Sequence, residues 1–380
     1  MERPRRIDSI DLLRGAIMIV MALDHVRDFL SPRASPTDLA TTTVPLFFTR
    51  WITHFCAPGF MLLAGLSIGI QRSRGATRSA LARFLVTRGL WLVVLEVTIL
   101  RMAGFAFTVD VTHPLLLVIW ALGACMIVMA AVVWLPSRVV LPLAAIGIVG
   151  HNLLDHVDST SLPWLVLHRP GLFELGPFHG IVGYPLIPWV FVMMLGYALA
   201  PIFSWDAARR RRVLLAAGTL MVVAFVVVRA TNVYGDPFPW ASQPRGAAYT
   251  FLSFLNCTKY PPSLCFLLMT LGPLFIGLAA LENVRAPVVV TYGRVPFFYY
   301  VLHIPLIHLV AIVYAQVSIG RSDFLIDMNP ITAFDNVPAY GMSLAGTFAV
   351  WIAVVAALYV PCRWYAAVKA RSRSPWLSYL

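Results

Sequence analysis

The stretch MALDHVRDFL brings four ionisable side chains, Asp24, His25, Arg27 and Asp28, to the end of an apolar run, AIMIVMAL. Ionisable groups at membrane depth are costly, so they normally face a bundle interior or a wet cavity. A histidine oriented by a carboxylate is a base–orienter pair of the kind used in acid–base catalysis. We therefore take His25 as the candidate general base, with Asp24 and Asp28 as competing orienters, and expect Arg27 at the far membrane surface.

Arg14 precedes His25 by eleven positions in the same predicted helix. At about 100° and about 1.5 Å per residue, the two side chains share a face and stand about 16 Å apart along the axis. This spacing predicts an anion-binding Arg14 near one membrane surface and a base near the other. The alternative is that these charges pair with one another or with neighbouring helices and only fix packing.

A second set of polar residues lies in FFTRWITHFCAPGFMLLAG, residues 47–65. Arg50 and His54 are one helical turn apart, which places them on one face. The Pro58–Gly59 pair is expected to loosen the helix and free backbone groups to line a cavity. We expect Arg50 to stabilise an oxyanion and His54 to share a pocket with His25 or to replace it as the base; a kink with a packed core histidine is the alternative.

The third set lies in YGRVPFFYYVLHIPLIHL, residues 292–309. His303, in the middle of the apolar run, is a candidate catalytic residue, whereas His308 is expected near the far boundary. Their five-residue separation lacks the i, i+4 geometry of a zinc helix. Arg294 either meets a phosphate or only follows the topology rule for basic residues.

The rest of the chain is suited to holding such groups in a bilayer. Of its 380 residues, 59% are hydrophobic and 12% charged, and the mean hydropathy is +0.80. A spanning helix needs about 20 mostly apolar residues. We predict an all-α polytopic membrane protein, a single domain over residues 1–380, with about ten spans: 10–30, 45–70, 84–100, 114–134, 138–152, 184–203, 213–229, 262–281, 296–317 and 341–361.

The basic residues indicate the orientation of these spans. The net charge of +12 resides mainly in short loops between apolar runs, which favours topology over nucleic-acid binding. Arginines before the first span and after the second, fourth, sixth, eighth and tenth predict cytoplasmic N- and C-termini; they include Arg3, Arg5, Arg6, Arg72, Arg74, Arg138 and Arg285. We read the N-terminus as a retained first span in the inner (cell) membrane, since no A-x-A-like cleavage site follows it.

Several familiar chemistries lack their motifs. The chain has no phosphate-binding G-x-x-x-x-G-K-[ST] loop and no H-E-x-x-H zinc helix, which disfavours nucleotide hydrolysis and the usual zinc hydrolase mechanism. The five scattered cysteines lack metal-type spacing. In HNLLDHVD the two histidines are five apart, so no metal is predicted.

Three segments together resemble a known family. IDSIDLLRGAIMIVMALDH, TRWITHFCAPGFMLLAGLSI and YGRVPFFYYVLHIPLIH are similar to the bacterial branch of the heparan-alpha-glucosaminide N-acetyltransferase catalytic-domain family, among the transmembrane acyltransferases. The similarity is strongest over about 5–75 and 290–310. It includes the D-x-x-R-G start, formed here by Asp11, Arg14 and Gly15.

The resemblance implies transfer of an acyl group, typically acetyl, from cytoplasmic acyl-CoA to a sugar hydroxyl or amine across the membrane, as in polysaccharide modification. Carried over by residue, Arg14 and Gly15 match the family's R-G pair, and His303 falls on a family histidine. His25 takes the position of a site asparagine in the lysosomal member. The catalytic histidine of that member lies in the next loop, which here reads SPRASPTDLATTTVP and has none; we favour His25 for its role and keep His54 as a partner.

The expected function is thus a membrane acyltransferase. Arg14 and Asp11, with Arg72, Arg74 and Arg294, form the expected binding site for acetyl-CoA as co-substrate. The acceptor is a glycan or another hydroxyl or amine compound, and the oligomeric state, a homo-oligomer included, stays open. The alternative is a multi-span transporter or flippase for an anionic or sugar-bearing substrate, which predicts interrupted spans in two repeated halves.

Overall fold

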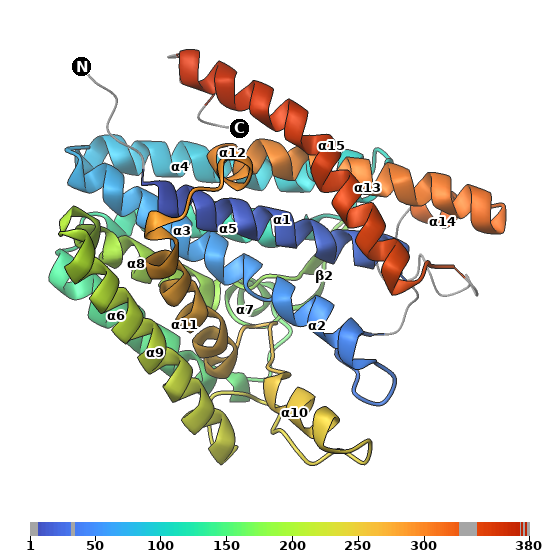
Figure 1. Cartoon of the computed structure of the whole chain (residues 1–380), viewed down its shortest axis with the longest axis horizontal. Helices are drawn as coiled ribbons and strands as arrows, with labels where there is room; N and C mark the ends of the chain where they lie inside the picture. The colour runs from blue at the N-terminus through green and yellow to red at the C-terminus, as the bar shows by residue number, and fades with distance from the viewer. Residues whose placement is uncertain (1–6, 32–34, 327–339, 373, 375–376, 378–380) are drawn as a thin grey trace.

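The computed structural model describes residues 7–31, 35–326, 340–372, 374 and 377. Arg3, Arg5 and Arg6, used above to orient the first span, lie outside these residues. The chain is mostly helical (Figure 1). In the N-terminal half, the helices and strands are α1 (Asp8–Leu30), α2 (Val44–Thr53), α3 (Cys56–Ser73), α4 (Arg78–Leu95), η1 (Glu96–Phe105), β1 (Leu115–Leu116), α5 (Val118–Val132), α6 (Ser137–Gly150), η2 (His151–His156), α7 (Leu162–Leu167), β2 (Gly171–Leu175) and β3 (Phe178–Val182).

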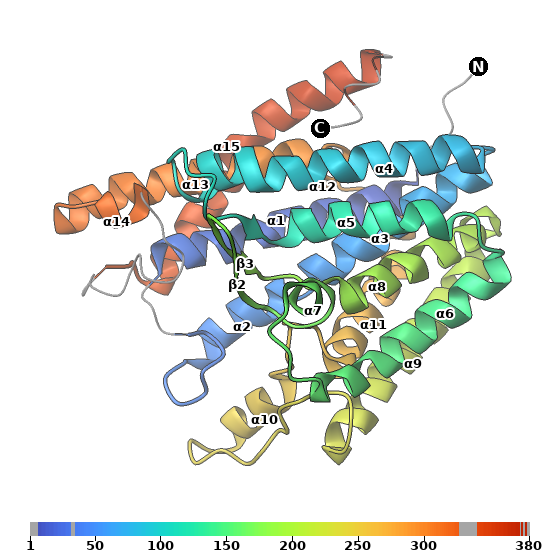
Figure 2. The ribbon, with the colours of Figure 1, turned by 180° about the vertical axis from the view of Figure 1, so that it is seen from behind.

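The C-terminal half is likewise a series of helices. It comprises α8 (Leu186–Leu199), η3 (Ala200–Ser204), α9 (Ala207–Thr231), α10 (Ala247–Leu255), α11 (Leu264–Ala280), η4 (Leu281–Asn283), α12 (Pro287–Arg294), α13 (Pro296–Ile319), α14 (Asp323–Ile326) and α15 (Leu344–Arg371). A small sheet with strand order β1-β3-β2 lies beside α7 (Figure 2). It qualifies the all-α expectation without changing the class.

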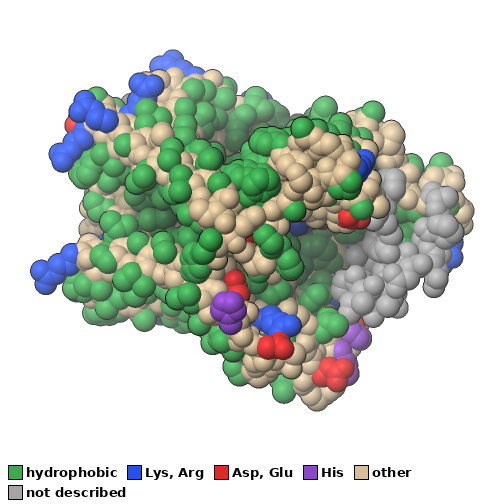
Figure 3. Space-filling model, turned by 90° about the horizontal axis from the view of Figure 1, so that it is seen from below, with side chains coloured by type: hydrophobic (Ala, Val, Ile, Leu, Met, Phe, Trp, Pro, Cys, Tyr) green, Lys and Arg blue, Asp and Glu red, His purple; other side chains and the backbone are tan. Residues whose placement is uncertain are grey.

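Helices occupy all ten predicted stretches, but the expected count of ten spans is not confirmed. Seven helical stretches in the described residues are long and apolar enough to cross a membrane: 44–73, 137–156, 186–204, 207–231, 264–283, 296–319 and 344–371. The stretch 118–132 is apolar but shorter. Figure 3 shows a face covered largely by hydrophobic and uncharged side chains, with Lys and Arg concentrated toward one side; such a surface suits a bilayer.

Helix α1 lies inside the bundle, where it packs against α2, α3, α12, α13 and α15 (Figure 1). Its contact with α12 depends on two glycines. A Cβ on Gly15 would lie 1.9 Å from the carbonyl oxygen of Val289, and one on Gly293 would lie 1.8 Å from that of Asp11. Small residues allow membrane helices to approach this closely. Gly15 thus has a packing role, and the contact holds Arg294 close to Arg14.

The second predicted span is broken in the middle. Helix α2 ends at Thr53 and α3 begins at Cys56, so the interruption falls just before the Pro58–Gly59 pair that was expected to loosen the helix. Because a proline cannot donate a backbone hydrogen bond, it is tolerated in the first turn of the new helix. His54 and Phe55 keep right-handed helical backbone angles, so the interruption is a local irregularity within one helical stretch, 44–73.

Candidate active site

A first cavity, of about 500 Å³, surrounds Arg14 and is called here the Arg14 cavity. Among the described residues, its charged lining side chains come from five helices, α1, α3 with its C-cap, α4, α12 and α15: Asp11, Arg14, Arg74, Arg88, Arg294 and Lys369. Five cations thus face one carboxylate, an arrangement suited to a polyanionic ligand. Four of the five residues expected to bind acetyl-CoA line it. Arg72 does not; its guanidinium donates to the carbonyl of Ala76 at 3.1 Å.

The Arg14 side chain is held by three elements. Its Nη1 donates to Asp11 Oδ1 at 3.0 Å and to the Gly293 carbonyl at 3.3 Å, and its Nη2 donates to Ser67 Oγ at 3.0 Å. A guanidinium fixed in this way presents a preorganised charge to an anion.

A second cavity, of about 360 Å³, lies further along α1 and is called the His25 cavity. Its polar lining residues are Asp24, His25, Asp28, Arg50, Thr53, Tyr184, Lys259, Tyr260 and Tyr300. Four of the six expected catalytic residues are among them. The exceptions are His54 and His303.

The carboxylates beside His25 bind arginines. Arg50 Nη1 donates to both Asp24 oxygens, at 2.7 and 2.6 Å, and Thr53 Oγ1 donates at 2.8 Å. Arg27 contacts Asp24 as well and donates to Asp28 at 2.8 Å. Arg27, expected at the far membrane surface, has a side chain that is only 4% exposed and pairs with both carboxylates. Within the described ranges, neither carboxylate hydrogen-bonds His25.

His303 instead lies beside His25, with their ring centroids 5.1 Å apart. It is fully buried and is not part of the cavity lining. Its Nδ1 lies 2.7 Å from the Tyr300 carbonyl, and because a carbonyl only accepts, Nδ1 must carry the proton. Its Nε2 is therefore a bare acceptor, without a hydrogen-bond partner among the described residues.

His54 is not part of the lining of either cavity. Its ring is 3% exposed and packs 5.2 Å from the ring of Phe266 on α11. Arg50, one turn earlier, faces the His25 cavity. The geometry therefore favours His25 over His54 as the base.

The two cavities adjoin. Phe60 of α3, Val118 of α5 and Tyr300 of α13 line both of them. These three side chains therefore form the boundary at which the two cavities meet.

Sequence reasoning missed Tyr184, Lys259 and Tyr260. Lys259 and Tyr260 belong to the loop between α10 and α11, more than two hundred residues from His25. The only signal in the sequence is that Lys259 is one of two lysines in the chain and stands in a compact, proline-containing segment, TKYPPS. The described residues contain no group of three His, Cys, Asp or Glu side chains placed to hold a metal ion.

The structure is that of a multi-pass helical membrane protein in which a cavity lined by several cations adjoins a second, polar cavity. The catalytic model of heparan-alpha-glucosaminide N-acetyltransferase matches residues 6–241, and the chain belongs to this family. Membership indicates an acetyltransferase of the membrane. No curated protein matches the chain closely enough to add a relative. Lys259, Tyr260 and His303 lie beyond the matched range.

Proposed function

We propose that the protein transfers an acetyl group from cytoplasmic acetyl-CoA to a hydroxyl or amine of a glycan on the far side of the membrane. The observation that supports this most directly is the junction of the two cavities at Phe60, Val118 and Tyr300. The Arg14 cavity has the charge for the phosphates of CoA, and the pantetheine arm would carry the thioester through the junction.

In this proposal His25 is the general base. Its ring lines the far cavity and has no protein hydrogen-bond partner in the described part of the chain, so it is available to an acceptor. It removes the proton from the acceptor, which attacks the thioester carbon. The neutral ring of His303, whose centroid lies 5.1 Å from that of His25, takes the place of a carboxylate and stabilises the protonated His25 ring. Transfer through an acyl-histidine would use the same groups.

Asp24, Asp28 and Arg50 shape the charge of this chamber. Asp24 holds Arg50 through two hydrogen bonds, which fixes the guanidinium at the cavity wall. Arg27 balances the remaining negative charge of Asp24 and Asp28. In this mechanism the carboxylates of Asp24 and Asp28 hold the guanidinium groups of Arg27 and Arg50 in place and balance their positive charges near His25.

The test is to purify the full chain in detergent and titrate it with CoA and acetyl-CoA. Arg14→Ala should weaken binding about tenfold to a hundredfold, the value of about 1.5–3 kcal/mol for a hydrogen bond to a charged group. Arg72→Ala, an arginine nearby but outside the cavity, is the matched control and should bind as the wild type does. A folded protein that does not bind CoA would refute the proposal.

A second experiment addresses the base. Transfer from acetyl-CoA is measured with D-glucosamine as amine acceptor and a methyl glucoside as hydroxyl acceptor. His25→Ala should abolish transfer while CoA binding persists, and His54→Ala should retain it. The opposite pattern would move the base to His54.

A further inference from the structure

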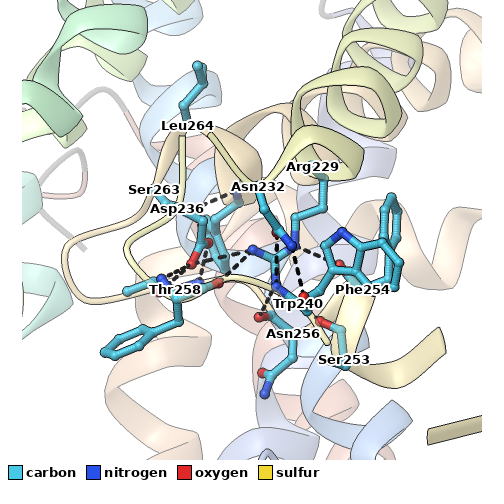
Figure 4. A network of polar contacts seen from close by, with 12 residues as sticks. Arg229, Asn232, Asp236, Trp240, Ser253, Phe254, Asn256, Thr258, Ser263 and Leu264 are labelled. Carbon is cyan, nitrogen blue, oxygen red and sulfur yellow. Dashed lines mark hydrogen bonds and ion pairs between the residues drawn. The ribbon is translucent and has the colours of Figure 1, made fainter. Parts of the chain in front are cut away.

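The loop that carries Lys259 and Tyr260 is fixed by a buried polar network (Figure 4). Arg229, at the end of α9, donates to the carbonyl oxygens of four residues: Phe238 at 2.8 Å, Phe254 at 3.0 Å, Ser253 at 3.1 Å and Asn256 at 3.1 Å. The residue is 2% exposed. One guanidinium thus ties the segment after α9 to the end of α10.

Asp236 fixes the loop on both sides of the two cavity residues. It accepts hydrogen bonds from the Thr258 backbone and hydroxyl, both at 2.9 Å, and from Ser263 Oγ at 2.7 Å (Figure 4). Thr258 precedes Lys259, and Ser263 follows the two prolines after Tyr260. Because both ends are held, Lys259 and Tyr260 are presented to the His25 cavity in a defined position, as preorganised catalysis requires.

The Tyr260 hydroxyl is oriented by two neighbours. Arg50 Nη2 donates to its oxygen at 3.2 Å, and the Tyr184 hydroxyl lies 3.5 Å away. A phenol has one proton to donate. The oxygen of Tyr260 accepts from Arg50, and when the Tyr184 hydroxyl donates to the same oxygen, the proton of Tyr260 is available to a group in the cavity.

The charges around Tyr260 make this hydroxyl an unusually good donor. Burial raises its pKa, but the positive charges of Lys259 and Arg50 more than offset that effect and lower the pKa to about 8. The Lys259 ammonium lies 5.2 Å from the Tyr260 ring centroid. It has no carboxylate within ion-pair distance among the described residues, so its charge is directed at the cavity.

We propose that Tyr260 is a catalytic residue whose hydroxyl donates a hydrogen bond to the oxyanion of the tetrahedral intermediate, with Lys259 and Arg50 stabilising that negative charge. The role rests on the acetyl transfer proposed above. The acceptor loses its proton to His25 and bonds to the thioester carbon, and the carbonyl electron pair moves to the oxygen beside Tyr260. Collapse restores the carbonyl and breaks the carbon–sulfur bond, and the CoA thiolate takes the proton from His25. Tyr260 keeps its own proton throughout.

The charged and titratable groups that face this hydroxyl define its pH dependence. They are Asp24 of α1, Arg50 of α2, Tyr184 of the segment before α8 and Lys259 of the same loop; His25 and Asp28 line the cavity as well. Tyr260 donates only while protonated, so its contribution is present below about pH 8 and is lost as the pH rises through that value.

The experiment compares Tyr260→Phe with Tyr184→Phe in the full-length purified protein. Loss of one oxyanion donor lowers kcat by about 10²–10³-fold in well-studied cases. We expect this loss for Tyr260→Phe, with unchanged KM for acetyl-CoA and unchanged CoA binding, and a much smaller effect for Tyr184→Phe. CoA binding also shows that each variant is folded.

A third variant separates catalysis from packing. Lys259→Met keeps the aliphatic stem but removes the charge, so the alkaline limb of the kcat profile should move to higher pH, whereas Tyr260→Phe should lose that limb. A wild-type enzyme whose Tyr260→Phe variant keeps its kcat, or whose limb is unmoved in Lys259→Met, would overturn the role of Tyr260 alone. A wild-type protein that binds CoA but transfers to no acceptor would overturn the acetyl transfer itself.

Discussion

The buried carboxylate of Asp236 offers a sharp test of what stabilises the loop at the His25 cavity. Its side chain is 2% exposed and lies 3.6 Å from Arg229 Nη1. It also accepts from the Thr258 and Phe238 amides and from two hydroxyls. Asp236→Ala would leave a buried guanidinium without its counter-charge and several donors without an acceptor. Breaking a buried pair in this way costs about 3–5 kcal/mol.

Asp323 provides the matched control. It pairs with Arg321 through two shorter contacts, 2.9 and 2.7 Å, but is 68% exposed. Water screens an exposed pair and solvates either partner alone. Asp323→Ala should therefore leave stability essentially unchanged, although its ion pair is the shorter of the two.

The assay is reversible unfolding of the purified protein in mixed micelles by titration with SDS, followed by tryptophan fluorescence. Asp236→Asn, which keeps one acceptor oxygen, should fall between the wild type and Asp236→Ala. Equal losses for Asp236→Ala and Asp323→Ala would show that burial does not decide the cost. An Asp236→Ala protein as stable as the wild type would remove the basis for a rigid loop.

Three further predictions concern packing and charge. Gly15→Ala should reduce the yield of folded protein strongly, because its Cβ would meet a carbonyl oxygen of α12 at 1.9 Å; Gly150→Ala, with no heavy atom within 4 Å of the added Cβ, should express normally. Glu96→Ala should cost about 1–3 kcal/mol in the SDS assay, since this buried carboxylate accepts from two amides at the start of α5, at 2.7 and 2.9 Å, and Glu96→Gln should cost less. Burial raises the pKa of Asp110, but hydrogen bonds from Thr112 outweigh burial and lower the pKa to about 2. The Asp110 carboxylate therefore stabilises the fold above its unfolded pKa of about 3.9, and this contribution is lost as the pH falls toward 2. Asp110→Asn should flatten the stability–pH curve between these two values.

The helices were largely predictable because hydropathy acts locally. Every predicted apolar stretch contains helix. Arg14 and His25, predicted to share one face of the first helix, line two cavities along α1. The period of the α-helix alone fixes the relative positions of Arg14 and His25, because both residues belong to one rigid helix.

Relations between elements were less predictable. Arg50 and His54 were expected on one face and in one pocket, but Arg50 lines the His25 cavity whereas His54 packs on Phe266. Asp24 was expected to orient His25, and it binds Arg50 and Thr53 instead. A carboxylate next to a histidine in the sequence need not hydrogen-bond that histidine when an arginine from another helix lies within hydrogen-bond distance.

The sequence by itself determined a helical membrane protein of this family, with an arginine and a histidine on one face of its first helix, because composition, period and motif are properties of the chain alone. Only the tertiary structure decided that Lys259 and Tyr260 face His25 and that the Arg14 and His25 cavities meet at Tyr300. Those neighbours come from helices and loops far apart in the chain. Their positions depend on how closely helices cross at residues such as Gly15 and on the hydrogen bonds of Asp236, which no local pattern specifies.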